Sequence, residues 1–321
     1  MRSRRSSYLR AIGARLLAGL PVFLLVTFAA TALSDLMPGS AAQTILGDTA
    51  TPQQIATLNA QYGFDAPSWE RYLRWLGNVV QGDLGRTLYS QQPIAGLLLN
   101  RAAVTFEIAL LAMFTSLAIA IPLALFSATR PGGITDSALR ALSSTMLSVP
   151  IFVTVVLLGF VFANALRWLP ATGWVSPAED LIGNLRYVAL PSMCLALAQS
   201  AYFYRVSRSE FVTTLQEDFV LVSRAKGLPS AYILLRHVLR PSLPQVLTVF
   251  GLSMSHLLGG SFIVESYFAT PGIGWTVLGA VKGHDLPTVQ AILSLTVVVF
   301  VLMFIVVDVG YALIDPRVQA S

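Results

Sequence analysis

The chain has 321 residues, of which 55% are hydrophobic and only 12% are charged, with a net charge of +5. Soluble domains usually carry about twice that charged fraction, so the composition argues against an ordinary soluble domain. The distribution of basic residues around membrane spans accounts for the positive charge, and no nucleic-acid partner is expected.

Six stretches of 18 to 26 residues contain no Asp, Glu, Lys or Arg. About 20 apolar residues cross the hydrocarbon core as a helix. None of the stretches shows the alternation of a barrel strand, and only helices or closed barrels satisfy their backbone in lipid. We therefore predict an all-α polytopic membrane protein with six transmembrane helices, at 16–34, 108–129, 141–166, 187–204, 241–264 and 286–307.

Five arginines precede the first stretch, as they would in a signal peptide, but its apolar core is too long for cleavage. With the N-terminus inside, the cytoplasmic segments hold 14 of the 21 Lys and Arg residues. The sequence therefore predicts a bacterial inner-membrane protein with both termini in the cytoplasm. Its parts would be a cytoplasmic segment 1–15 and a transmembrane domain 16–321, with a periplasmic loop 36–101 and a cytoplasmic segment 205–240.

Two short amphipathic helices are predicted in the long outer loop. Thr51-Pro52-Gln53-Gln54 is typical of an N-cap followed by proline and a capping-box glutamine, and Gly63 would end this helix. A second helix would run from Ser68 to Gly82, with one apolar stripe of Trp69, Tyr72, Leu73, Leu76 and Val80. The two helices form either a cap on the spans or a docking surface for an extracellular partner.

The segment 205–240 contains a short helix between two turns. Asp218 can cap a helix over 219–226, and Gly227 with Pro229 would end it. Basic residues beside a membrane can serve topology alone. That role would not explain a capped helix between turns.

Side chains of two kinds are expected on this helix. Phe219, Val222 and Ala225 recur at helical spacing and would make one side apolar. Arg224 and Lys226 lie near the C-terminus, where cations suit the helix dipole.

Gly251, Ser255 and Gly259 recur every four residues in the fifth predicted span, and such small residues let helices approach closely. His256 and Cys194 are the ionisable side chains deep in a span. His256 is either a pore residue or a hydrogen-bonded packing residue, and we favour packing.

Several catalytic motifs are absent from the sequence. It contains no G-x-x-x-x-G-K-[ST] phosphate loop, no H-E-x-x-H and no cysteine cluster, so no ATP site, metal, cofactor or enzyme activity is expected. Proton-coupled carriers usually require a charged residue near the centre of a span, and this sequence has none there. The energy for any transport is therefore expected to come from a partner.

The segment 217–228, which reads EDFVLVSRAKGL, resembles the cytoplasmic coupling segment of binding-protein-dependent ABC importer permeases, in particular the dipeptide/oligopeptide/nickel family. The long outer loop resembles that of the first of the two permease subunits in such systems. The chain departs from the family's pattern at three positions. Ser40 stands in place of an aspartate, Ser223 stands in place of an alanine, and Pro244 lies one position earlier than usual. Further matching motifs follow in the family's order: Gly82-Asp83-Leu84-Gly85, Thr105-Phe106-Glu107, Glu265-Ser266-Tyr267-Phe268 with Pro271-Gly272-Ile273-Gly274, and Val307-Asp308-Val309-Gly310-Tyr311 with Asp315-Pro316-Arg317.

The resemblance implies a type I ABC importer permease fold. It also implies a second homologous permease, two ATPase subunits or domains, an extracytoplasmic substrate-binding protein and surrounding membrane lipid as partners. The residues that would couple to an ATPase are Asp218, Phe219, Val222, Arg224, Ala225, Lys226 and Gly227. The residues that would form the outer gate or contact the binding protein are Trp69, Asp83, Phe268, Pro271 and Gly272.

Two other functions remain open from the sequence: a channel or secondary carrier without an ATPase partner, and a membrane scaffold without transport activity. The substrate is also open among peptides, nickel complexes, glutathione, and sugars or opines.

Overall fold

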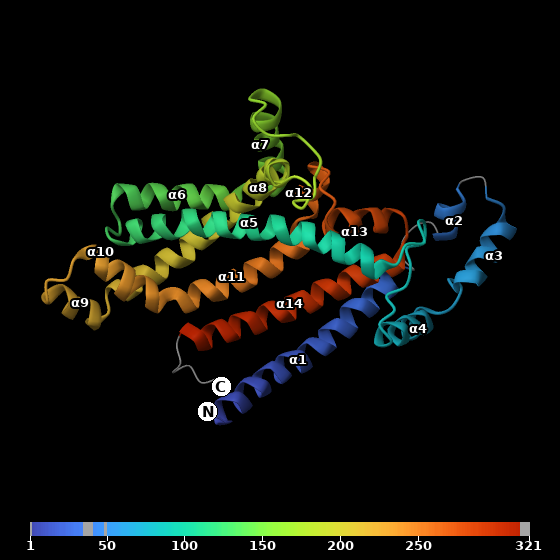
Figure 1. Ribbon diagram of the computed structural model, residues 1–321, viewed down its shortest axis with the longest axis horizontal. Coiled ribbons are helices and arrows are strands. Elements are labelled where there is room, and N and C mark those ends of the chain that lie inside the picture. The colour runs from blue at the N-terminus through green and yellow to red at the C-terminus, as the bar shows by residue number, and fades with distance from the viewer. Residues whose placement is uncertain (1, 35–40, 48–49, 315–321) are drawn as a thin grey trace.

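The computed structural model describes residues 2–34, 41–47 and 50–314, which form an all-α protein (Figure 1). The motif residues 315–317 and the departure at Ser40 lie outside these residues. The helices are α1 Arg2–Ser34, α2 Ala41–Leu46, α3 Pro52–Tyr62, α4 Ser68–Val80, α5 Ile94–Ala128, α6 Ile134–Ser148, α7 Ile151–Leu158, α8 Leu181–Leu215, α9 Asp218–Ala225, α10 Ser230–Tyr232, α11 Arg240–Gly260, α12 Phe262–Tyr267, α13 Ile273–Lys282 and α14 Leu286–Ile314, with π-helical segments η1 Gly159–Ala165 and η2 Ile233–Leu239.

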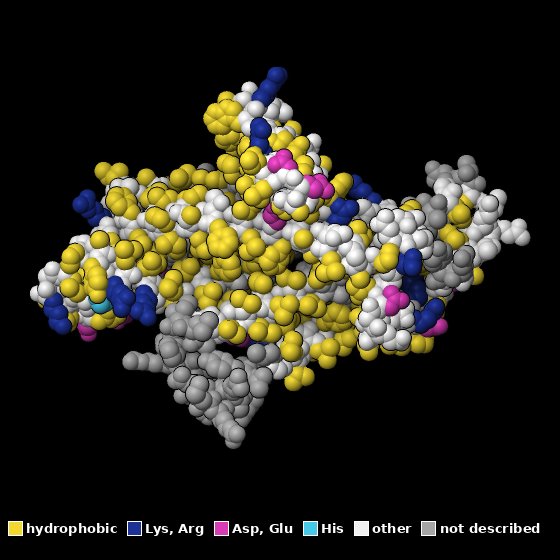
Figure 2. Space-filling view, viewed as in Figure 1, with side chains coloured by type: hydrophobic (Ala, Val, Ile, Leu, Met, Phe, Trp, Pro, Cys, Tyr) yellow, Lys and Arg dark blue, Asp and Glu magenta, His cyan; other side chains and the backbone are white. Residues whose placement is uncertain are grey.

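The longest helices run along the long axis of the molecule, with α2 to α4 at one end and α9 and α10 at the other (Figure 1). We call these the α4 end and the α9 end. Figure 2 shows a largely hydrophobic surface between them, with Lys and Arg side chains toward both ends and on the part that projects at the top of the view. This distribution matches an apolar band flanked by water-facing ends.

The core of the bundle is the contact between α5 and α8, the most extensive helix pair in the described chain. Small buried residues of α5, including Ala112, Ser116 and Ala120, lie on the contacting side, which lets the two backbones approach closely. The Ser116 hydroxyl donates to the Ala196 carbonyl of α8 at 3.1 Å. α1 packs mainly on α14 and α4, at the edge of the bundle.

Within the described residues, four helices are long and apolar enough to cross a membrane, over 15–33, 94–128, 181–215 and 286–310. α6 and α7–η1 make a fifth span if the pair, bent by 99°, counts as one. The predicted number of six spans is therefore not confirmed. The remaining predicted span corresponds to α11, which is 21 residues long but contains no comparably apolar stretch.

The predicted span 141–166 is not one continuous helix. α6 ends at Ser148, and Val149 takes an extended conformation with φ −80° and ψ 120°. The residue before a proline is pushed out of the helical region, so Pro150 breaks the helix. The following arm, α7–η1, stands away from the bundle (Figure 1), and its Phe152 and Phe160 side chains are more than half exposed.

The two predicted helices of the outer loop are present, and the caps of the first are confirmed. Thr51 and Gln54 form a capping box, and Gly63 takes the left-handed conformation with φ 69°. The predicted apolar stripe of the second helix faces largely outward, which leaves both the cap and the docking surface open. α4 turns Tyr72 and Trp75 toward α1, while Trp69 and Leu73 remain more than half exposed.

Candidate functional site

The predicted coupling helix is present as α9, but it begins one residue earlier than predicted. Glu217 occupies the N-cap position without a side-chain hydrogen bond, and Asp218 is the first helical residue. The expectation that Asp218 caps the helix is therefore wrong. Its carboxylate still lies in the first turn, where a negative charge favours the helix dipole.

The C-terminus of α9 ends as the sequence predicts. Gly227 has φ 73°, which is the left-handed region. The Leu228 N–H donates to the Ser223 carbonyl at 3.3 Å and the Gly227 N–H to the Arg224 carbonyl at 2.9 Å. These two bonds form a Schellman motif, which satisfies the last carbonyls and fixes the direction of the following turn.

The two sides of α9 differ in exposure. Val220 and Ser223 are buried against the protein's own helices, and α9 contacts α8 and η2. Phe219 is 43% exposed and Val222 is 51% exposed, so the predicted apolar side faces away from the chain. Ala225, Arg224 and Lys226 are exposed beside it. The described chain thus holds α9 by one side and leaves an apolar and basic side open.

An ion pair that the sequence reasoning missed lies at the same end. The Arg208 guanidinium of α8 donates to Asp136 at the start of α6, with an Nη2–Oδ2 distance of 2.7 Å. The Ser127 hydroxyl of α5 also donates to this buried carboxylate. Three helices are therefore tied together close to the point where α8 leads into α9. The one feature of the sequence that could have indicated this ion pair is that Asp136 and Arg208 both lie just outside predicted spans.

Toward the α4 end, the buried Glu265 carboxylate joins three helices. Thr105 Oγ1 of α5 donates to Glu265 Oε1 at 2.7 Å, and Ser261 Oγ donates to the same oxygen at 2.6 Å. The Trp275 N–H of α13 donates to Oε2 at 3.0 Å. Thr105 Oγ1 also accepts from the Ile273 N–H at 2.8 Å. A carboxylate at the N-terminus of α13 is stabilised by the orphan N–H groups there.

The segment between α12 and α13 wraps this carboxylate closely. A Cβ at Gly272 would lie 2.5 Å from Glu265 Cδ and 2.5 Å from Thr105 Oγ1. A Cβ at Gly274 would lie 2.5 Å from the Phe262 Cα. The predicted gate residues Phe268 and Gly272 are buried, and the Pro271 carbonyl accepts from Arg101 at 3.1 Å. We call Thr105, Ser261, Glu265 and the segment 271–275 the carboxylate latch.

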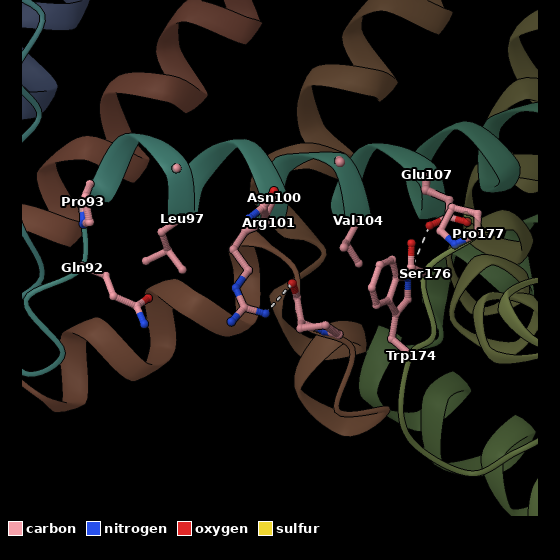
Figure 3. Close-up of a pocket in the computed structure, with 13 residues that line it drawn as sticks. Gln92, Pro93, Leu97, Asn100, Arg101, Val104, Glu107, Trp174, Ser176 and Pro177 are labelled. Atoms are coloured by element: carbon pink, nitrogen blue, oxygen red, sulfur yellow. Dashed lines mark hydrogen bonds between the residues drawn. The ribbon is translucent and has the colours of Figure 1, made fainter. Parts of the chain in front are cut away.

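Beside the carboxylate latch, α5 lines a cavity of about 930 Å³ (Figure 3). Its polar lining includes Gln92, Asn100, Arg101, Glu107 and Ser176. Glu107 Oε2 accepts from the Trp174 indole at 3.3 Å. Sequence reasoning did not select Arg101 or assign Glu107 a role, although both lie where the charge-free stretch of α5 ends.

The other two predicted outer residues lie elsewhere. Trp69 is exposed on α4, and Asp83 Oδ1 accepts from the Gly85 N–H at 2.8 Å in a surface turn. Neither lines the cavity. The structure therefore gathers Phe268, Pro271 and Gly272 but not Trp69 or Asp83.

Two of the small residues predicted as a packing stripe lie on the packed side of α11. Gly251 lies against Val307 of α14 with no room for a Cβ, and Ser255 is buried. The surroundings of Gly259 lie outside the described part. His256 is exposed on this chain, so the favoured packing role is not found within it.

Two family models together match residues 8–320. The first, described as a binding-protein-dependent transport system inner membrane component, matches residues 120–320. The second, described as the N-terminal part of such a membrane component, matches residues 8–120. The chain belongs to this family. The resemblance inferred from the sequence motifs is therefore confirmed.

Relatives and a solved structure agree with this assignment. A "Probable peptide ABC transporter permease protein" of Sinorhizobium fredii is 32% identical over 305 residues, covering 95% of this chain and 97% of the relative. A dipeptide transport system permease protein of Alkalihalophilus pseudofirmus is 31% identical over 325 residues, covering 95% and 98%. The inward-facing MetNI methionine ABC transporter matches the fold with a TM-score of 0.56 at 16% identity, covering 70% of this chain and 99% of that chain.

The chain is therefore a permease subunit of a binding-protein-dependent ABC importer, in the type I importer permease fold. It is a multi-pass inner-membrane protein and a transport subunit, not an enzyme. Membership of the family implies an ATPase and a substrate-binding protein as partners.

Proposed function

We propose that this permease imports peptides and forms the pathway together with a second homologous permease, driven by two ATPase subunits. The relatives named for peptide and dipeptide transport support the substrate class. The observation that carries the coupling mechanism is the open side of α9, where Phe219 and Val222 are about half exposed at a fixed end of α8.

In this proposal α9 sits in a groove of an ATPase subunit. Phe219 provides the apolar anchor, because buried aromatic side chains commonly dominate such interfaces. Arg224 and Lys226 contact the rim. ATP binding draws the two ATPase subunits together, and α9 passes that displacement to α8. The Schellman turn at Gly227 keeps the orientation of the helix fixed while it moves.

Reconstitution tests this function against a secondary carrier. The complete complex in proteoliposomes should accumulate a radiolabelled dipeptide only when ATP and the loaded binding protein are both supplied. ATP-independent uptake by the permeases alone would favour the carrier. Absence of dipeptide uptake, together with uptake of another solute by the same complex, would reject the peptide assignment.

We expect both termini and the segment 205–240 in the cytoplasm, because 14 of the 21 Lys and Arg residues then lie inside. Alkaline phosphatase, which is active only in the periplasm, should be active when fused at Ser90 and inactive when fused at Ser230. Both residues are exposed near the ends of the bundle. Phosphatase activity at Ser230 would reverse this topology.

We expect the isolated subunit to hydrolyse no ATP and to move no peptide, because its sequence contains no phosphate-binding loop. Its ATPase partners should co-purify with the wild-type chain from membranes. Hydrolysis that persists in a preparation free of the partner subunits would contradict the assignment of energy supply to them.

A further inference from the structure

We infer that the cavity beside α5 binds the charged termini of a short peptide, with Arg101 holding the carboxylate and Glu107 holding the amino group. The inference rests on the proposed peptide transport and names a binding site for it within this chain. Figure 3 shows both side chains leaving α5 beside the same cavity, with the lining residue Val104 between them in the sequence and Asn100 next to Arg101.

The two charges are arranged to receive a ligand with opposite charges at its ends. Both side chains are partly buried, and neither has an ion-pair partner in the described ranges. Arg101 Nη1 donates to a neutral carbonyl, that of Pro271, and Glu107 accepts from a neutral indole. Each of these bonds has only one charged partner. A ligand carboxylate on Arg101 and a ligand ammonium group on Glu107 would add the attraction between opposite charges, and a carboxylate can also pair with a guanidinium through two parallel bonds.

The positions of the two residues on α5 favour a short ligand. Arg101 and Glu107 are six positions apart, which places their backbones about 9 Å apart along the helix axis. An extended peptide spans at most about 3.3–3.6 Å per residue, so two or three residues bridge this distance. The cavity volume, about 930 Å³, lies within the range of small-ligand sites and leaves room for varied side chains. Asn100 and Ser176 add uncharged polar groups that can bond the peptide backbone.

The first test uses direct labelling, which does not depend on transport. Benzoylphenylalanine in place of Leu97, another lining residue, should photolabel radioactive dialanine in the solubilised complex. Adding Arg101→Gln should lower the labelling at least tenfold, and so should adding Glu107→Gln. Arg101→Lys should retain most of it. Absence of labelling in the Leu97 variant, or labelling that neither neutral substitution lowers, overturns the site.

The second test separates terminus binding from a structural role. The C-terminal amide of dialanine lacks the carboxylate, so Arg101→Gln should lower its labelling less than twofold. N-acetyl-dialanine lacks the charged amino group, so Glu107→Gln should lower its labelling less than twofold. A purely structural defect would lower the labelling of every peptide equally. The matched controls are Arg186→Gln and Glu179→Gln, exposed residues that do not line the cavity, which should leave all labelling unchanged.

Transport by the wild-type complex then reports the proposed function separately. Dialanine uptake with a failed labelling test would keep peptide import and reject this site. If Arg101→Gln instead releases the second permease on purification, the cavity is a subunit contact, and the inference is wrong.

Discussion

Replacing Gly227 with valine is expected to abolish ATP-driven uptake while the chain inserts at its normal level. The position has φ 73°, where a residue with a Cβ costs about 1 kcal/mol or more and a β-branched residue costs most. No atom lies within 4 Å of a Cβ built there, so the effect comes from the backbone and not from a clash. The valine should open the Schellman turn and redirect α9, without disturbing the bundle.

Membrane abundance, uptake and retention of the ATPase subunits are the measurements. Gly227→Asn is the matched control, because asparagine tolerates the left-handed region, and it should keep most activity. Phe219→Ala should also lose the ATPase subunits, at about 2 kcal/mol or more of binding free energy. Arg224→Ala should be mild if its contact is at the solvated rim. Wild-type uptake and ATPase retention in both Gly227→Val and Phe219→Ala would show that α9 is not the coupling helix.

Alanine at Gly272 or Gly274 is expected to destabilise the carboxylate latch and stop uptake. At Gly274 the new Cβ would meet the Phe262 backbone, which cannot swing aside. At Gly272 it would meet Glu265, whose two oxygens are held by three donors. Overpacking of this kind typically destabilises a protein by about 1–3 kcal/mol. Here the added methyl group can be accommodated only if one of the helices moves.

Thermal denaturation of the purified complex and uptake are the measurements for this prediction. Gly279→Ala in the same helix is the control, since nothing lies within 4 Å of its Cβ, and it should behave as wild type. Glu265→Gln should lower the melting temperature, because one acceptor oxygen is replaced by an NH₂ group that faces other donors. The expected loss of stability is about 1–3 kcal/mol. Unchanged melting and uptake in Gly274→Ala would mean that this segment is not tightly packed in the working complex.

Signals that act within a few residues could be predicted from the sequence. The capping box at Thr51 and the helix ends at Gly63 and Gly227 are fixed by neighbouring backbone geometry, and all are confirmed. The Asp218 cap failed because aspartate also suits the first turn, and one residue separates the two positions. The stripe of α4 alone could not show which of its apolar side chains are covered, because that depends on where α1 packs.

The membrane spans were predicted from the absence of charged residues, which gives no information on whether the helix continues in one direction or bends. The stretch 141–166 has enough apolar residues for one span, but Pro150 divides it into two helices at 99°. The proline was visible in the sequence, and giving it more weight would have predicted the break. α11 packs against α8 and α14 within the bundle, although it contains no stretch as apolar as those of the other spans.

The carboxylate latch could be predicted only as separate motifs. Thr105 and Glu265 are 160 residues apart in the sequence, and their 2.7 Å hydrogen bond depends on how α5 and α12 pack. The resemblance pointed to both segments without giving a reason for them. The structure supplies that reason, because Thr105 positions the start of α13 and the carboxylate at the same time.

The length of α8 has a mechanical consequence. It is one continuous helix of 35 residues, about 52 Å long, and α9 begins three residues after it ends. Near its first turn, Asn184 Nδ2 donates to the Val175 carbonyl, in the connection whose Gly173 N–H donates to the Phe268 carbonyl. Pro191 removes one backbone hydrogen bond near that end, which softens the helix there. If α9 is the coupling helix, as proposed, α8 would carry its displacement as a single strut to the segment beside the carboxylate latch, through the turn that Pro191 softens.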